Sequence, residues 1–169
     1  CESLEQNQTL PSELNTLASR LDSTEQSLGD TNPQVIELKK QYSLLEIRDY
    51  LITQQVDTRC GYAPAEVLYF YSNDGSCADC TDAGYALDAM RQTYPTLRVY
   101  SFDYNLDLGA LKTLIALEKV QPQFPAFVID GKASDGFTTL AALESLFPPR
   151  ALATTTATST TATSTSSAK

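Results

Sequence analysis

Two cysteines, Cys77 and Cys80, are separated by two residues in the stretch Cys77-Ala78-Asp79-Cys80. Thiols at this spacing can close into a disulfide and reopen. The pair follows an apolar run, residues 67–72, and opens a segment with a helical pattern, so the first thiol is expected to meet the positive end of a helix dipole, which favours its thiolate. This placement favours thiol–disulfide exchange. The spacing alone leaves zinc binding and a static disulfide as alternatives.

The composition narrows the chemistry that can accompany this pair. The chain of 169 residues contains no histidine, which excludes Cys–His and Ser–His catalytic pairs and histidine-ligated metal sites. The formal net charge is −9 at pH 7, and nucleic acid and anionic membrane surfaces repel an acidic protein. We therefore expect small molecules or other proteins as partners, and no nucleic acid.

The N-terminal residue suggests processing. The chain begins at Cys1 and its single methionine is Met90, so we expect a product from which an N-terminal segment was removed. No stretch reaches the roughly 18 to 20 apolar residues that a membrane-spanning helix needs. A first-position cysteine resembles the lipid-modified residue of a mature bacterial lipoprotein, which would tether the protein to a membrane, as would a removed N-terminal anchor. An excised fragment or an ordinary disulfide partner are the alternatives.

A helical hairpin is predicted for residues 12–56, after a polar segment at residues 1–11. Leucines recur at helical spacings toward Gly29, where the first helix should end. Asn32 and Pro33 supply an N-cap and a first-turn proline for the second helix. We expect the apolar stripe of this hairpin to pack on itself or on the following domain. A stalk that holds the domain away from a membrane, or a coiled coil for self-association, are the alternatives.

The pattern changes after a turn-rich linker, residues 57–66. Residues 67–147 follow the order β-α-β-α-β-β-α, which predicts an α/β fold with one central mixed sheet and helices on both faces. The expected strands are 67–72, 97–103, 126–129 and a weak one at 136–137, and the expected helices are 77–94, 107–120 and 138–147. Residues 148–169 are almost entirely Ala, Ser and Thr after two prolines, which predicts a disordered tail or spacer.

A second landmark lies beyond the cysteines. Pro125 comes directly before the apolar residues 126–129 and the turn Asp130-Gly131. With the C-x-x-C that follows a core strand, this arrangement resembles the thioredoxin fold over residues 67–147. In that family a cis-proline precedes the third strand and faces the cysteines, and a cis bond is accessible at X–Pro. The resemblance implies a thioredoxin-like α/β fold, here with an N-terminal helical hairpin.

The resemblance also implies residue roles. Cys77, the more exposed thiol, would be the nucleophile toward a substrate disulfide, and Cys80, one turn deeper, would resolve the mixed disulfide. The backbone of Phe124, beside Pro125, would bind an extended substrate peptide as one more strand. The reaction would need no metal and no organic cofactor. It would need protein thiol or disulfide substrates and a redox partner protein that resets the pair.

The chain departs from the family's pattern around the cysteines. Ser76 stands where the family usually has an aromatic residue, and the loop before Cys77 is a residue or two longer. The first strand carries Tyr69 and Tyr71 in place of a buried acid that relays protons. The acids that could replace it are Glu66, Asp74 and Asp79. The charge of Asp79 also disfavours a neighbouring thiolate, so we predict a pair that is less oxidising than that of strong disulfide-forming enzymes.

The two remaining cysteines are Cys1 and Cys60. We expect a structural disulfide between them, which requires an oxidising compartment. The alternatives are a lipidated Cys1 with a free Cys60, or Cys60 as an additional redox partner of Cys77. Neither cysteine belongs to a second close pair, which disfavours zinc.

These residues together predict a thiol–disulfide oxidoreductase that exchanges disulfides with protein substrates through Cys77 and Cys80. Its expected location is extracytoplasmic: the periplasm, the cell surface or a secreted form. The alternative is a non-catalytic thioredoxin-fold adaptor or surface assembly component with a structural C-x-x-C disulfide, which Ser76 and the missing acid favour. An antioxidant role in peroxide reduction is a further alternative.

Overall fold

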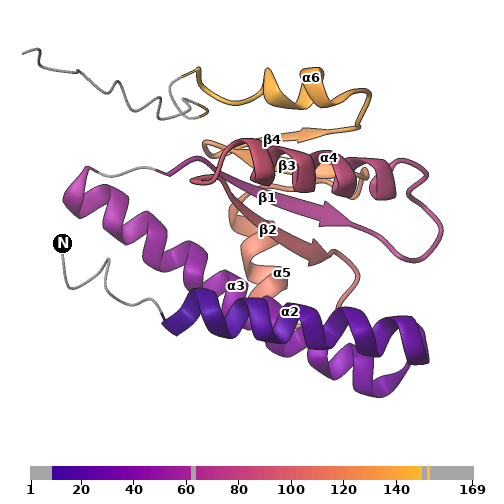
Figure 1. Ribbon diagram of the computed structural model, residues 1–169. Helices are drawn as coiled ribbons and strands as arrows, with labels where there is room; N and C mark the ends of the chain where they lie inside the picture. The colour runs from indigo at the N-terminus through magenta and orange to yellow at the C-terminus, as the bar shows by residue number, and fades with distance from the viewer. Residues whose placement is uncertain (1–8, 62–63, 150–151, 153–169) are drawn as a thin grey trace, which may run out of the picture.

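A four-stranded mixed sheet forms the centre of the structure, a computed structural model that describes residues 9–61, 64–149 and 152. Helices cover both faces of this sheet (Figure 1). The elements in chain order are α2 (Thr9–Leu28), α3 (Pro33–Cys60), β1 (Glu66–Tyr71), α4 (Cys80–Thr93), β2 (Arg98–Asp103), α5 (Gly109–Leu117), β3 (Ala126–Ile129), β4 (Lys132–Asp135) and α6 (Leu140–Glu144). The predicted disorder of the tail falls almost entirely outside the described residues.

The strand order is β2-β1-β3-β4. β1 pairs in parallel with β2, from Glu66 opposite Arg98 to Tyr71 opposite Asp103. β3 runs antiparallel to both β1 and β4. The predicted mixed sheet with flanking helices is therefore confirmed, and its order is compatible with a thioredoxin-like arrangement. The carboxyl ends of β1 and β2 lie side by side with the amino end of β3.

Alternation along the strands creates two apolar cores, one on each face of the sheet. In β1, Leu68 and Phe70 face α3 and α5, whereas Val67 and Tyr69 face α4 and α6. The first core is completed by Ile47, Tyr50, Tyr100, Phe102, Leu106, Leu111, Leu114, Val120, Ala126 and Val128. The second is completed by Ala65, Ala83, Ala86, Leu87, Met90, Leu97, Phe127, Ile129, Leu143 and Phe147. β1 is thus buried on both faces, as its apolar run predicts.

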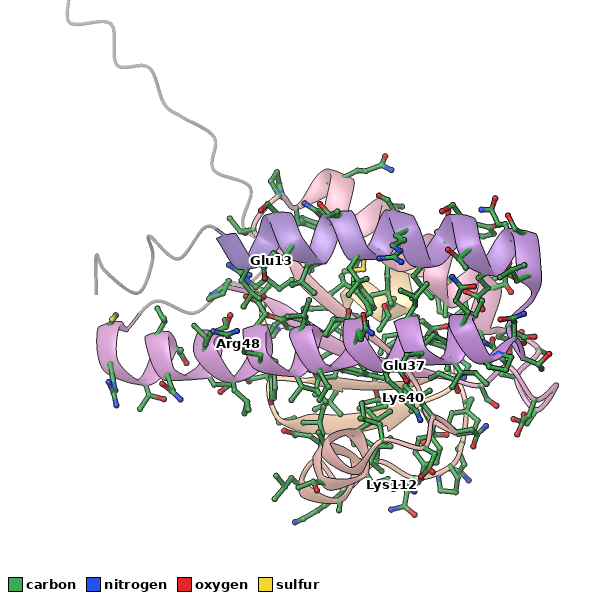
Figure 2. The ribbon with its side chains drawn as sticks, turned by 90° about the horizontal axis from the view of Figure 1, so that it is seen from below. Glu13, Glu37, Lys40, Arg48 and Lys112 are labelled. Atoms are coloured by element: carbon green, nitrogen blue, oxygen red, sulfur yellow. A yellow bond between two sulfur atoms is a disulfide. The ribbon has the colours of Figure 1, made fainter. Side chains whose placement is uncertain are left out.

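The N-terminal hairpin is part of this layered structure. α2 and α3 lie side by side and antiparallel (Figure 2), and α3 packs against β2 and α5. The Asn32 side chain accepts a hydrogen bond from the Gln34 N–H at 2.9 Å, which confirms the predicted N-cap. α3 continues to Cys60, four residues beyond the expected end at Val56, and Gly61 terminates it in the left-handed region with φ 66°. α3 is therefore a layer over the sheet and not a stalk held away from it.

The end of the chain differs from expectation around β4. β3 and β4 are joined by the two-residue turn Asp130-Gly131, in which both residues have positive φ, as a type I′ hairpin requires. Such a tight turn starts β4 at Lys132, so the strand expected at 136–137 instead ends at Asp135. Thr139 then caps α6 by accepting a hydrogen bond from the Ala142 N–H at 3.1 Å. α6 is accordingly shorter than the expected 138–147 helix.

A buried carboxylate covers the outer edge of the sheet at β2. Glu46 of α3 is 1% exposed, and its Oε1 accepts a hydrogen bond from the Ser101 N–H at 2.9 Å. Its Oε2 has no hydrogen-bond partner within the described part of the chain. Burial raises the pKa of Glu46 well above the usual value of 4.5, while the bond from Ser101 opposes that shift. The folded state therefore holds a proton on this group more tightly than the unfolded state does.

Replacing Glu46 with Gln should remove a pH-dependent cost. A raised folded-state pKa means that the contribution of Glu46 to wild-type stability falls as pH rises above about 4.5, the unfolded-state value. Each unit of elevation costs about 1.4 kcal/mol once the pH exceeds the folded-state pKa. Glu46→Gln should lose less free energy of unfolding than wild type between about pH 5 and about pH 8, on the order of 1 kcal/mol. Urea unfolding at both pH values measures this.

The control for this experiment is Glu37→Gln, which removes an exposed acid from the same helix. It should keep the wild-type loss of stability over that pH interval. Equal pH profiles for wild type and Glu46→Gln would contradict the assignment of this cost to Glu46.

Candidate functional site

Cys77 and Cys80 form a disulfide at the end of the sheet where β1 finishes. Their sulfur atoms are 1.97 Å apart and their Cα atoms 5.5 Å apart. Cys77 is half-buried, whereas Cys80 is 9% exposed. Cys77 is therefore the more exposed residue of the pair, as predicted.

The prediction that Cys77 opens a helix is wrong. α4 begins at Cys80, and Asp79 is its N-cap residue without a side-chain capping hydrogen bond. Cys77 lies three residues before the first helical residue. The helix dipole acts mainly within the first turn, so it favours negative charge at Cys80 more than at Cys77.

We define residues 72–79 as the Cys77 loop, and Asp74 organises its first half. Asp74 Oδ1 accepts hydrogen bonds from the Ser72 hydroxyl at 2.6 Å and from the Ser76 N–H at 2.8 Å. Asp74 Oδ2 accepts one from the Asn105 amide at 3.1 Å. The bonds from Ser72, Ser76 and Asn105 lower the pKa of Asp74 to about 2. Asp74 is therefore ionised at neutral pH and unsuited to the proton relay for which it was a candidate.

A short segment at the end of β2, residues 103–105, contacts both the Cys77 loop and Phe124. The Asn105 amide donates to Ser72 Oγ at 2.8 Å and so reaches the Cys77 loop. The Tyr104 N–H donates to the Tyr71 carbonyl at 2.9 Å, and the Tyr104 ring packs edge-on against Phe124 with centroids 4.9 Å apart. This segment thereby fixes the Cys77 loop and the residue before Pro125 relative to each other.

Phe124 and Pro125 lie at the same end of the sheet as the cysteines. The Phe124–Pro125 peptide bond is cis, as the resemblance implies. Pro125 is buried and Phe124 is half-buried. Ala126 of β3 pairs with Phe70 near the carboxyl end of β1, and β1 leads directly into the Cys77 loop. The predicted catalytic pair and the predicted peptide-binding residues are thus gathered at one end of the sheet.

Two further acids named as substitutes for a proton relay are also poorly suited to it. Glu66 begins β1, five residues before its end, which corresponds to about 17 Å of strand. Burial raises the pKa of Glu66 to about 7, but that group lies away from the cysteines. Asp79 is exposed at the N-cap of α4. All three candidate acids are therefore either distant from the pair or open to solvent.

A tyrosine of β1 lies against Cys80. The Tyr69 hydroxyl donates a 2.6 Å hydrogen bond to the Cys80 carbonyl, and its ring stacks on Phe127 with centroids 5.6 Å apart. Burial raises the pKa of Tyr69, so the hydroxyl stays neutral. Tyr69 therefore anchors the start of α4 to β1 but carries no negative charge that would accept a proton from Cys80.

Cys60 ends α3 and is itself disulfide-bonded. Gly61, the next residue, and Glu66, the first residue of β1, line the same cavity of about 800 Å³. This shared cavity places Cys60 near the amino end of β1. Cys77 is at the carboxyl end of the same strand and is bonded to Cys80. Cys60 is therefore not a redox partner of Cys77 in this structure. Cys1, its predicted partner, lies outside the described residues.

A groove borders the Cys77 loop on the side of β4 and α6. It has a volume of about 320 Å³ and combines acidic and apolar walls. Its lining residues include Asp79, Asp135, Gly136, Phe137, Leu143 and Leu146. The Gly136 N–H donates to the Pro125 carbonyl at 2.8 Å, so the groove begins next to the cis-proline. Its position would let a peptide bound near Cys77 extend over α6.

The described part of the chain contains no cluster of three or more Cys, Asp or Glu side chains suited to a metal ion. Within that same part, no helix has the length and apolar character required to cross a membrane.

Sequence reasoning did not identify Ser72, Tyr104 or Asn105 as parts of the site. The spacing of Asp103 and Asn105 carries a weak signal, because the Asn105 N–H donates to Asp103 Oδ1 at 3.1 Å in a turn that Asp favours. Their contacts with the Cys77 loop depend on strand pairing.

Comparison with known proteins assigns neither a family nor a function to this site, because no protein-family model matches the chain and a search of curated proteins finds no match. The functional argument therefore depends on the residues themselves.

Proposed function

We propose that this chain is a thioredoxin-like thiol–disulfide oxidoreductase that acts on protein substrates through Cys77 and Cys80. The observation that supports it most is the gathering of a C-x-x-C disulfide and the Phe124–Pro125 cis bond at one end of a mixed sheet. The strand order and the position of the pair between β1 and α4 are compatible with that fold.

The exchange proceeds in two balanced steps. The Cys77 thiolate attacks one sulfur of a substrate disulfide, and the other substrate sulfur leaves as a thiolate that takes up a proton. Cys80, once deprotonated, attacks the Cys77 sulfur and releases the first substrate sulfur as a second thiolate. Two electrons pass from the dithiol to the substrate, and the protein ends with the Cys77–Cys80 disulfide. The reverse sequence oxidises a substrate dithiol.

The substrate is an extended peptide segment that carries a cysteine. Its backbone lies beside Phe124, and its neighbouring side chains enter the groove next to Asp79 and Phe137. No metal or organic cofactor takes part, and a redox partner protein resets the pair. The compartment is extracytoplasmic. The disulfide at Cys60 supports this, because a disulfide outside a redox-active pair is typical of an oxidising environment. A lipid at Cys1 would add a membrane tether.

The second candidate is a non-catalytic adaptor in which the same disulfide is structural. Two observations favour it. Tyr69 replaces the relay acid beneath Cys80, and Ser76, exposed before Cys77, offers no aromatic surface to a substrate.

An insulin-reduction assay separates the two candidates. With dithiothreitol as the reductant, wild type should accelerate insulin precipitation, and Cys77→Ser should reduce the rate to the uncatalysed background because the nucleophile is lost. Cys80→Ser should be similarly inactive. When the reduced variant is incubated with insulin after dithiothreitol has been removed, it should accumulate a mixed disulfide with the substrate, visible on a non-reducing gel. Wild-type activity no higher than that of Cys77→Ser would contradict the oxidoreductase and leave the adaptor as the favoured candidate.

The position of Cys77 outside the helix predicts moderate thiol reactivity. In the reduced protein, the alkylation rate of Cys77 by iodoacetamide should be half-maximal at about pH 6 to 8, within the range of thiols that are only mildly activated. Asp79→Asn should shift that midpoint downward, because it removes a negative charge between the cysteines.

Asp88→Asn, an exposed change farther along α4, should leave the midpoint of Cys77 alkylation unchanged. A wild-type midpoint below about pH 5 would contradict this prediction, since it is the behaviour of a strongly oxidising pair.

A further inference from the structure

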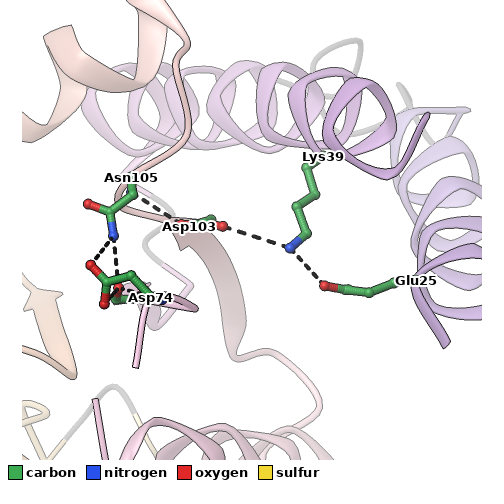
Figure 3. Close-up of polar contacts among 6 residues, drawn as sticks. Glu25, Lys39, Asp74, Asp103 and Asn105 are labelled. Carbon is green, nitrogen blue, oxygen red and sulfur yellow. Dashed lines mark hydrogen bonds and ion pairs between the residues drawn. The ribbon is translucent and has the colours of Figure 1, made fainter. Parts of the chain in front are cut away.

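A buried lysine links the N-terminal hairpin to the sheet. Lys39 of α3 is 4% exposed, and a buried ammonium group is stable only when it is paired. Its Nζ lies 2.7 Å from Glu25 Oε1 of α2 and 3.7 Å from Asp103 Oδ2 at the end of β2 (Figure 3). Lys39 thus joins three elements at the end of the sheet that carries the cysteines.

The contacts continue from Asp103 to the residue before Cys77. Asp103 Oδ1 accepts a hydrogen bond from the Asn105 N–H at 3.1 Å. The Asn105 amide donates to Ser72 and Asp74, and Asp74 accepts from the Ser76 N–H at 2.8 Å. An unbroken series of polar contacts therefore runs from α2 to Ser76, as Figure 3 shows for its central part.

The charge on Asp103 depends on Lys39. Burial raises the pKa of Asp103, the Asn105 N–H and Lys39 lower it, and Glu25 and Asp30 raise it further. Without Lys39, the pKa of Asp103 would rise further, so more of this group would be in its neutral, protonated form. Its hold on Asn105 would weaken, because a bond to an ionised acceptor is about twice as strong as a neutral one.

We propose that Lys39 is a positioning residue for the Cys77–Cys80 pair, so that the α2–α3 hairpin sets how stable the disulfide is relative to the dithiol. The physical basis is the local concentration of the two thiols. A fixed Cys77 loop keeps both sulfurs near each other after reduction, whereas a loosened loop gains conformational entropy in the reduced state. This inference rests on the proposed function for its biological meaning. The equilibrium between dithiol and disulfide is a property of the cysteine pair and can be measured whether or not the protein is an enzyme.

The equilibrium with glutathione measures this coupling. One oxidised glutathione converts the dithiol to the disulfide and yields two reduced glutathione molecules. Lys39→Met should lower the equilibrium constant for disulfide formation about threefold to tenfold, the effect of losing one hydrogen bond of ordinary strength. This equals about 15 to 30 mV toward a more oxidising potential, at 29.6 mV per tenfold.

A matched control separates positioning from general loosening of α3. Asp49 lies on the same helix and accepts hydrogen bonds from Arg98 at 2.7 Å and Tyr100 at 2.9 Å, in the amino-terminal half of β2. Asp49→Asn should lower the free energy of unfolding but leave the glutathione equilibrium within about twofold of wild type, because it does not touch residues 103–105. An effect equal to that of Lys39→Met would overturn the proposal.

A second variant cuts the same series at the surface. Asn105 is exposed, so Asn105→Ala should fold even if Lys39→Met does not, and it should lower the constant to a similar extent. The double variant should match the single variants, since both interrupt one series. A wild-type constant in Lys39→Met, or in Asn105→Ala if Lys39→Met does not fold, would overturn the proposal. Absence of insulin reduction by wild type, with these shifts present, would instead reject only the proposed catalytic function.

Discussion

The parallel pairing of β1 with β2 is the constraint on which the rest of the site depends. It aligns Tyr71 with Asp103, so the chain leaves both strands at one end of the sheet, and the Cys77 loop meets residues 103–105 there. The antiparallel β3 starts at that end and brings Phe124–Pro125 with it. Backbone pairing therefore brings three segments that are distant in sequence to the same end of the sheet. This placement does not depend on the side-chain contacts within the site.

Sequence reasoning succeeded where the residues of one short segment determine its local structure. The apolar run of β1, the Asn32-Pro33 helix start and the Asp130-Gly131 turn each depend on neighbours within a few residues, and each is found where expected. The start of α4 was missed, because apolar periodicity indicates a helix but does not fix its first residue. Lys39 was missed because a lysine in a helix is ordinarily solvated, and its partners come from two other elements.

Three polar side chains of α3 follow β2 along its length. Lys39 meets Asp103, Glu46 meets the Ser101 N–H, and Asp49 meets Arg98 and Tyr100. Polar contacts specify the position of this 28-residue helix more strictly than apolar ones, because a buried polar group that loses its partner costs free energy. Because the polar partners lie at three positions along β2, they are all satisfied in only one alignment of α3 with this strand. Burying these charges costs desolvation free energy, and the alignment of the hairpin with the sheet is what they provide in return.

The carboxylate of Glu46 also affects how copies of this chain behave toward one another. An open strand edge invites pairing with a strand of another molecule, which leads to aggregates. At β2 that route is obstructed, because α3 lies along the strand and Glu46 already accepts the Ser101 N–H. At the other edge, β4 is four residues long and carries Lys132 and Asp135, and short charged strands are poor templates. Both edge strands of the sheet are thus protected against pairing with another molecule, whether the cysteines are oxidised or reduced.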